Sequence, residues 1–124
     1  MIKGRASSRS AADLAPAAAL FRGLSDPTRL AILRHLATGE HKVRELTEHL
    51  GLAQSTVSAH LACLAGCGLV ASRPVGRASL YALAAEPELL QVLAAAERLL
   101  TVTGHAVELC PHSGTPGPDG PAAA

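Results

Sequence analysis

Aromatic residues are almost absent from this 124-residue chain, which has no Trp, one Tyr and one Phe. Ala supplies 25 positions and Leu 20. A chain rich in these helix formers and poor in aromatic and β-branched residues does not suit a sandwich or barrel, and it predicts a mainly helical fold. A core without large aromatics is thin in so small a domain, so we expect an obligate homodimer that shares its apolar surface.

Cysteine is also scarce. The three thiols, Cys63, Cys67 and Cys110, are an odd number in an Ala-rich chain, which does not fit the disulfide scaffold of a small secreted domain. No long apolar run is present, because the uncharged stretch 49–72 contains Gln, Ser, Thr, His and Gly. Arg22 stands where a signal peptide would need small residues for cleavage. We therefore expect a cytoplasmic protein with no membrane partner.

Formal charge is unevenly distributed along the chain. Residues 1–77 hold ten Lys or Arg and five Asp or Glu, whereas residues 78–124 hold one Arg and five acids. Solvated charges can fall unevenly without consequence, but a basic front half and an acidic back half favour a polyanion partner for the front half alone.

Apolar stripes at helical spacing, with Asp or Pro at the start and Gly at the end, predict five helices and one hairpin. Asp13 is the expected N-cap of the first helix, and Asp26 of the second. The helices are expected at about 14–24, 27–37, 43–50, 54–66 and 86–100, and the hairpin strands at 69–73 and 78–83. Residues 1–12 and 111–124 are predicted to be disordered arms, which leaves one folded domain at 13–110.

The third and fourth expected helices are joined by a tight turn containing Gly51 and are followed by the hairpin. This order is typical of a winged helix-turn-helix. Short polar side chains near the start of the fourth helix can approach base edges and phosphates, and arginines flank the hairpin turn. Each residue alone could be a cap or a solvated side chain, but together with the basic front half they favour DNA binding. The candidate DNA-binding residues are Gln54, Ser55, Thr56, Ser58, His60, Arg73 and Arg77.

Three motifs in this region are specific in combination: LSDPTRLAIL at 24–33, ELTEHLGL at 45–52 and QSTVSAHL at 54–61. With the Gly-Arg turn ahead of Tyr81, they resemble the ArsR/SmtB family of metal-responsive repressors over residues 14–103. The resemblance implies a dimeric winged helix-turn-helix that is not an enzyme. It also implies repression of a detoxification operon until an effector binds, with the first and last helices at the dimer interface.

Cys63 and Cys67 are four residues apart, so on an unbroken helix their side chains share one face. Cys110 follows the last helix. A free Cys often packs as a small apolar residue, but three thiolates form a soft ligand set that suits a thiophilic ion. His105, Glu108 and His112 are near Cys110 in sequence and could add a ligand, although we interpret them as solvated groups of the tail.

Within the family, the third-helix Cys pair of arsenic sensors and the last-helix Asp/His set of zinc sensors have no counterpart here. The segment LACLAGCGLV at 61–70 instead resembles the cadmium/lead sensors. That resemblance implies that Cys63, Cys67 and Cys110 bind Cd²⁺ or Pb²⁺, with Zn²⁺ as a further metal, and that the C-terminal Cys comes from the other protomer. No organic cofactor is expected.

Two kinds of alternative function stay open. The same thiols could sense arsenite or an oxidant in a repressor of the same design. A metal-sequestering protein or a small thiol enzyme is the other class, but no general base pairs with a Cys, and the six His form no ligand pattern in the sequence.

Overall fold

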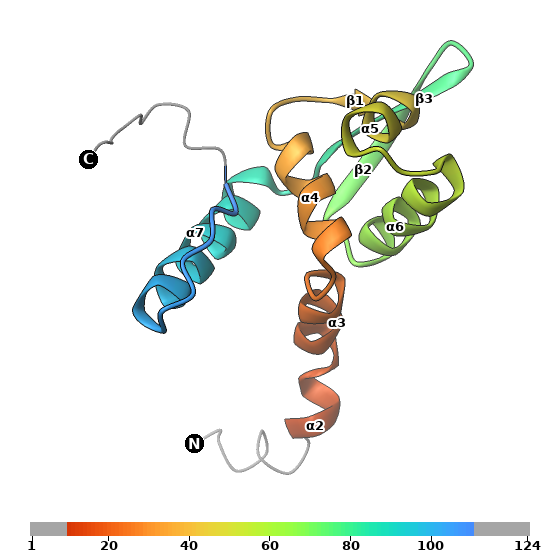
Figure 1. Ribbon diagram of the computed structural model, residues 1–124. Helices are drawn as coiled ribbons and strands as arrows, with labels where there is room; N and C mark the ends of the chain where they lie inside the picture. The colour runs from red at the N-terminus through yellow and green to blue at the C-terminus, as the bar shows by residue number, and fades with distance from the viewer. Residues whose placement is uncertain (1–9, 111–124) are drawn as a thin grey trace.

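The computed structural model describes residues 10–110 (Figure 1), so residues 1–9 and the tail expected at 111–124 lie outside the described part. Helices dominate, with one small sheet, as the composition predicts. The elements in chain order are α2 (Ser10–Asp13), α3 (Ala15–Gly23), α4 (Pro27–Leu36), β1 (His41–Lys42), α5 (Val43–Leu50), α6 (Gln54–Gly66), β2 (Val70–Val75), β3 (Ala78–Leu83) and α7 (Glu86–Val102).

Most helix ends follow the predicted caps. The extended Asp26 accepts a hydrogen bond from the Arg29 backbone N–H at 3.0 Å, and Pro27 is the first residue of α4. Gly51 closes α5 with φ of 67°, a left-handed conformation that glycine adopts without steric cost. The first helix differs from the prediction, because its N-cap is Leu14, which has no side-chain cap bond.

The helical part of the chain also begins earlier than expected. The short helix α2 starts at Ser10, so residues 10–12 are helical although the predicted disordered arm extended to residue 12. The hydrogen bond from the Leu14 N–H to the Ala11 carbonyl, at 3.3 Å, links α2 to the start of α3.

The sheet is antiparallel with strand order β1-β3-β2. Strands β2 and β3 form the predicted hairpin, in which Val75 pairs with Ala78 and leaves Gly76 and Arg77 as the turn. Strand β1 was not predicted, and it places His41 opposite Tyr81 on the other edge of β3. Two residues are too few to show an alternating pattern, so only the folded chain reveals this strand.

The core lies where α4 packs against α5, α6 and the sheet. Its fully buried side chains are all aliphatic, which agrees with the lack of aromatics: Ile32, Leu33, Leu46, Val57, Leu61 and Leu64. This packing holds α5 and α6 in a fixed arrangement beside the hairpin. Within the described residues, no helix is long and apolar enough to cross a membrane.

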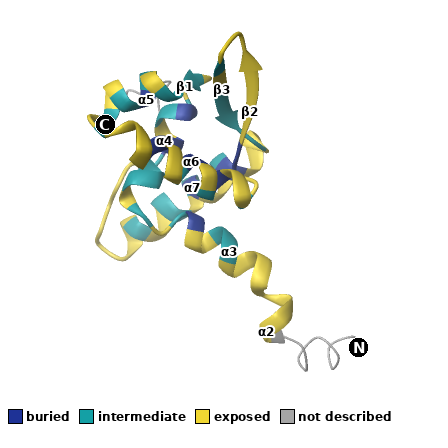
Figure 2. Cartoon of the chain, turned by 90° about the vertical axis from the view of Figure 1, so that its right-hand side faces the viewer, coloured by how far each residue is buried: buried dark blue, intermediate teal, exposed yellow. Residues whose placement is uncertain are grey.

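Large apolar side chains are exposed on α3 and α7. Phe21 of α3 is 62% exposed, and Leu99 and Val102 of α7 are 64% and 84% exposed. Figure 2 shows α3 extending from the body of the fold with mostly exposed residues. Apolar surface of this kind marks an association face. It lies on the two helices for which the sequence predicts a dimer interface.

Candidate functional site

The surface of α6 is divided into an apolar and a polar side. Val57, Leu61 and Leu64 recur at helical spacing and are fully buried against the core. Gln54, Ser55, Thr56 and Ser58 are consequently exposed near the N-terminus of the helix. The N-cap, Ala53, provides no side-chain hydrogen bond. No N-cap side chain therefore accepts from the first backbone N–H groups of α6. These groups lie at the positive end of the helix dipole, which favours the binding of anions.

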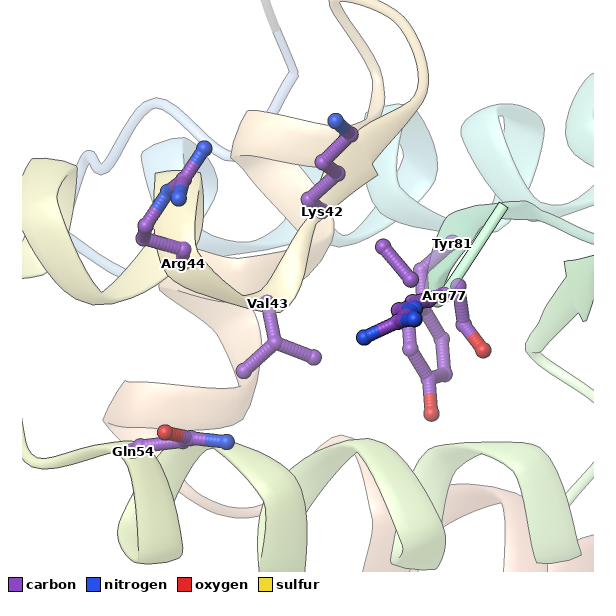
Figure 3. A pocket seen from close by; sticks show the side chains of 8 residues that line it. Lys42, Val43, Arg44, Gln54, Arg77 and Tyr81 are labelled. Atoms are coloured by element: carbon purple, nitrogen blue, oxygen red, sulfur yellow. The ribbon is translucent and has the colours of Figure 1, made fainter. Parts of the chain in front are cut away.

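A basic groove lies beside this N-terminus. Figure 3 shows Gln54 of α6 on one side of Val43, with Lys42 and Arg44 on the other and the Arg77 guanidinium extending toward the space between them. The remaining lining residues come from β3, and no acidic residue lines the groove. The groove joins the helix pair and the hairpin turn into one positively charged surface. Its lining residues are Lys42, Val43, Arg44, Gln54, Arg77, Ala78, Ser79 and Tyr81.

Lys42 and Arg44 were missed as candidate site residues in the sequence. They precede α6 by about ten residues and flank the start of α5, and only the folded chain brings them beside Gln54 and Arg77. The signal that could have found them is the excess of Lys and Arg in residues 1–77. All three cations of the groove belong to that part of the chain.

Two candidate DNA-binding residues already have partners within the chain. The Arg73 guanidinium donates two hydrogen bonds of 3.0 Å to Glu40, and this pairing lowers the pKa of the exposed Glu40 carboxyl. The His60 ring lies 3.3 Å from the Arg29 guanidinium and 3.8 Å from the Asp26 carboxylate. Arg73 and His60 therefore help to join elements, and their contact with DNA stays a prediction.

Cys63 and Cys67 share one side of the last turn of α6. The helix ends at Gly66, but the Cys67 N–H still donates to the Cys63 carbonyl at 3.1 Å, so the helical spacing of the two residues is kept. The Cys67 thiol lies under α3, with Sγ 3.4 Å from the Ala19 carbonyl oxygen. A Cβ placed on Gly23 would come within 3.1 Å of the same sulfur.

Cys110 lies elsewhere, folded back against α7 of its own chain. Its backbone N–H donates to the Glu97 carboxylate at 2.6 Å, and its Sγ is 3.7 Å from the Leu90 carbonyl oxygen. The Arg34 guanidinium donates to the Glu108 carbonyl at 3.0 Å and fixes the same segment to α4. Burial, followed by the negative charge of Glu97, raises the pKa of the Cys110 thiol.

The structure therefore brings Cys63 and Cys67 together, and it places Cys110, the third predicted ligand, apart from them. Figure 1 shows α6 and α7 on opposite sides of α4. Within residues 10–110, no group of three or more His, Cys, Asp or Glu side chains is in position to hold a metal ion. His105 and Glu108 lie in the segment that precedes Cys110, and His112 lies outside the described residues.

The environment of Cys110 predicts low reactivity. We expect iodoacetamide to alkylate Cys110 several times more slowly than Cys63 in the native protein, because Cys110 is 7% exposed and only the thiolate reacts. A raised pKa postpones thiolate formation to higher pH, so the difference in rate should narrow as the pH increases. Peptide mapping by mass spectrometry measures both rates. Equal alkylation rates of Cys110 and Cys63 in the native protein at pH 8 would contradict the buried position of Cys110. The control is the chain unfolded in guanidinium, in which the two rates should be similar.

Comparisons with known proteins place these features in a family. The sequence pattern of a family described as "Bacterial regulatory protein, arsR family" matches residues 26–72, which contain α4, α5 and α6. The chain is 45% identical to the HTH-type transcriptional regulator CmtR of Mycobacterium tuberculosis, over 74% of this chain and 88% of that protein. It is 37% identical to a probable mercury resistance operon repressor of Streptomyces lividans, over 75% of this chain and 74% of that protein.

A solved structure agrees with the fold. The homodimeric winged helix-turn-helix DNA-binding domain of Mb0332 from Mycobacterium bovis is 36% identical, with a TM-score of 0.63. The match covers 75% of this chain and 90% of that one. The predicted winged helix-turn-helix architecture is confirmed.

Proposed function

Because the chain belongs to the ArsR family of bacterial regulatory proteins, we propose that it represses transcription as a homodimer on operator DNA and releases the operator when a soft metal ion binds its thiols. The predictions of a transcriptional regulator and of no enzymatic activity agree with its relatives. The main support for DNA binding in this proposal is the position of the polar face of α6 beside the basic groove.

The arrangement suits one half-site of a duplex. An α-helix fits the major groove, where Gln54 and Ser55 are short enough to meet base edges. Arg77 at the hairpin turn, with Lys42 and Arg44, supplies cations for phosphates. A symmetric dimer carries two such surfaces, so we expect an imperfect inverted repeat whose half-sites are about 34–36 Å apart, or a multiple of that distance.

Variants of the groove separate the two kinds of contact. Arg77→Ala should weaken binding to all DNA sequences alike and reduce the slope of log K against log salt by about 0.9, because one phosphate contact is lost. Gln54→Ala should change the preferred bases, at about 1–3 kcal/mol for a lost contact. Fluorescence anisotropy with a panel of operator variants at several salt concentrations measures both effects.

The matched control is Arg98→Ala, which removes an exposed arginine from α7, outside the groove. It should leave both the affinity and the base preference unchanged. If Arg77→Ala altered the base preference and Gln54→Ala did not, the assignment of helix and hairpin to their contacts would be wrong.

The metal-responsive part of the proposed function is supported by the thiols and by the resemblance to cadmium/lead sensors. Cys63 and Cys67 are half-buried on one helix side, at a separation from which both sulfurs can reach one ion. We infer that Cys110 of the partner subunit is the third ligand, because the chain's own Cys110 packs on α7, on the opposite side of α4 from Cys63 and Cys67. Thiolates favour soft ions, with Cd²⁺ and Pb²⁺ as the proposed effectors.

The position of Cys67 connects this site to the dimer. Its thiol contacts the carbonyl of Ala19 on α3, one of the two helices with exposed apolar surface. A metal ion that ties α6 to a partner segment would change how α3 and α6 pack, and so the spacing of the two α6 helices. Operator and metal then favour different arrangements of one dimer, and each must weaken the binding of the other by the same factor.

A further inference from the structure

We propose that His35, His41 and His49 form a second metal site, selective for ions such as Zn²⁺ that favour imidazole and separate from the thiols. The folded chain gathers three of its six histidines, although the sequence shows no ligand pattern among them. His35 lies in the last turn of α4, His41 in β1, and His49 in the last turn of α5.

The spacing of the rings is close to that of a bound zinc site. Their centres are 5.2 Å apart for His35 and His49, 5.6 Å for His41 and His49, and 6.2 Å for His35 and His41. Three imidazoles bound tetrahedrally at a Zn–N distance of about 2.0–2.1 Å have ring centres roughly 5 Å apart. The three rings therefore need to converge by about 1 Å at most.

Hydrogen bonds prepare two of the rings as ligands. His41 Nδ1 lies 2.8 Å from the Gly39 carbonyl oxygen, and His35 Nδ1 lies 3.3 Å from that of Ala31. A carbonyl oxygen only accepts, so each Nδ1 carries the proton and each neutral ring has its lone pair on Nε2. A backbone carbonyl on the second ring nitrogen is the usual support of a metal-bound histidine.

A metal ion could bind only after the histidine rings are reoriented. In the described chain the three side chains are not yet in ligating positions, and the rings of His35 and His49 are stacked with 28° between their planes. His49 is exposed and can turn without displacing core residues. The terminal torsion of histidine is broad, so this rotation costs little.

One carboxylate lies near the cluster. Glu45 accepts a hydrogen bond from the Lys42 backbone N–H at 2.8 Å, and this bond is the main cause of its lowered pKa. Imidazole nitrogens suit Zn²⁺ and Ni²⁺, whereas thiolates suit softer ions, so the two sites differ in ligand chemistry. A metal here would join the end of α4 to β1 and to the helix that precedes α6.

Cobalt titration of a thiol-free protein tests the proposal. In the full chain carrying Cys63→Ser, Cys67→Ser and Cys110→Ser, Co²⁺ should bind with about one equivalent per chain. It should give d–d absorption without a sulfur charge-transfer band, and Zn²⁺ should displace it. His49→Gln and His41→Gln should each weaken binding about tenfold or more, which is at least the loss typical of disturbing a supporting residue.

His105→Gln, in the segment before Cys110, is the matched control and should leave Co²⁺ binding unchanged. Circular dichroism and operator affinity without metal show that each variant is folded. Absent Co²⁺ binding, or binding equally strong in His41→Gln, His49→Gln and the parent, would overturn the proposal. Because the thiols are absent from the test protein, neither result depends on the proposed cadmium response.

Discussion

Serine in place of Cys63, Cys67 or Cys110 is expected to yield a protein that still binds its operator and no longer releases it when Cd²⁺ or Pb²⁺ is added. Serine keeps the size of cysteine but supplies no thiolate, so the fold and the basic groove should be preserved. Coupling between two sites is typically about 1–3 kcal/mol, so added metal should lower operator affinity about 5–150-fold in the parent. Anisotropy of a labelled operator, with and without metal, measures the ratio.

Mixed dimers show which subunit supplies Cys110. A Cys63→Ser/Cys67→Ser chain combined with a Cys110→Ser chain regains one complete set of three thiols only if the set spans both protomers. We expect the mixture to recover part of the cadmium response. His105→Gln is the control that should respond fully. Full induction of the Cys110→Ser protein would remove this residue from the site.

The same variants separate the alternative effectors. If peroxide or arsenite releases the parent from its operator and Cd²⁺, Pb²⁺ and Hg²⁺ do not, the thiols sense oxidation or arsenite and the metal proposal is wrong. Hg²⁺ belongs in this series because one relative is a probable mercury resistance operon repressor.

Leu99→Glu should convert the dimer into monomers and lower operator affinity by about three orders of magnitude. Leu99 is 64% exposed on α7, beside other exposed apolar side chains, and a carboxylate buried there in a dimer would lack a partner. A monomer reaches one half-site only, so its binding should fall toward the non-specific level, which is typically about 10³-fold or more weaker. Sedimentation velocity and operator titration measure the two effects.

Gln91→Glu is the matched control for this prediction. It adds the same charge to the same helix at an exposed position that is already polar, and it should leave both dimerisation and operator affinity near those of the parent. A dimeric Leu99→Glu protein would show that α7 lies outside the interface.

Features that depend on neighbouring residues were predictable from the sequence. Asp26, Pro27 and Gly51 act on the adjoining backbone alone, so the ends of α4 and α5 could be read from the chain. The prediction of Asp13 as an N-cap was wrong because α2 directly precedes α3. The backbone at Leu14 is already helical, so α3 begins without a side-chain cap.

Features that depend on tertiary packing were not predictable. The groove brings Lys42 and Arg44 together with Arg77, which is more than thirty residues away in the chain. The histidine cluster depends on β1 pairing with β3, which sets His41 between the ends of α4 and α5. The separation of Cys110 from Cys63 likewise follows from the packing of α7, and spacing along the chain carries no sign of it.

The tight contact between Gly23 and Cys67 makes the packing of α3 on α6 sensitive to volume at one sulfur atom. A single added carbon on Gly23 would lie 3.1 Å from Sγ, closer than an ordinary van der Waals contact, so the sulfur or the glycine would have to shift by a few tenths of an ångström. A group bonded to that sulfur on the α3 side, whether a large cation, an oxygen or an alkyl adduct, would therefore require a shift of the Cys67 side chain or of the two helices. The radius of the bound group would then set the size of that shift.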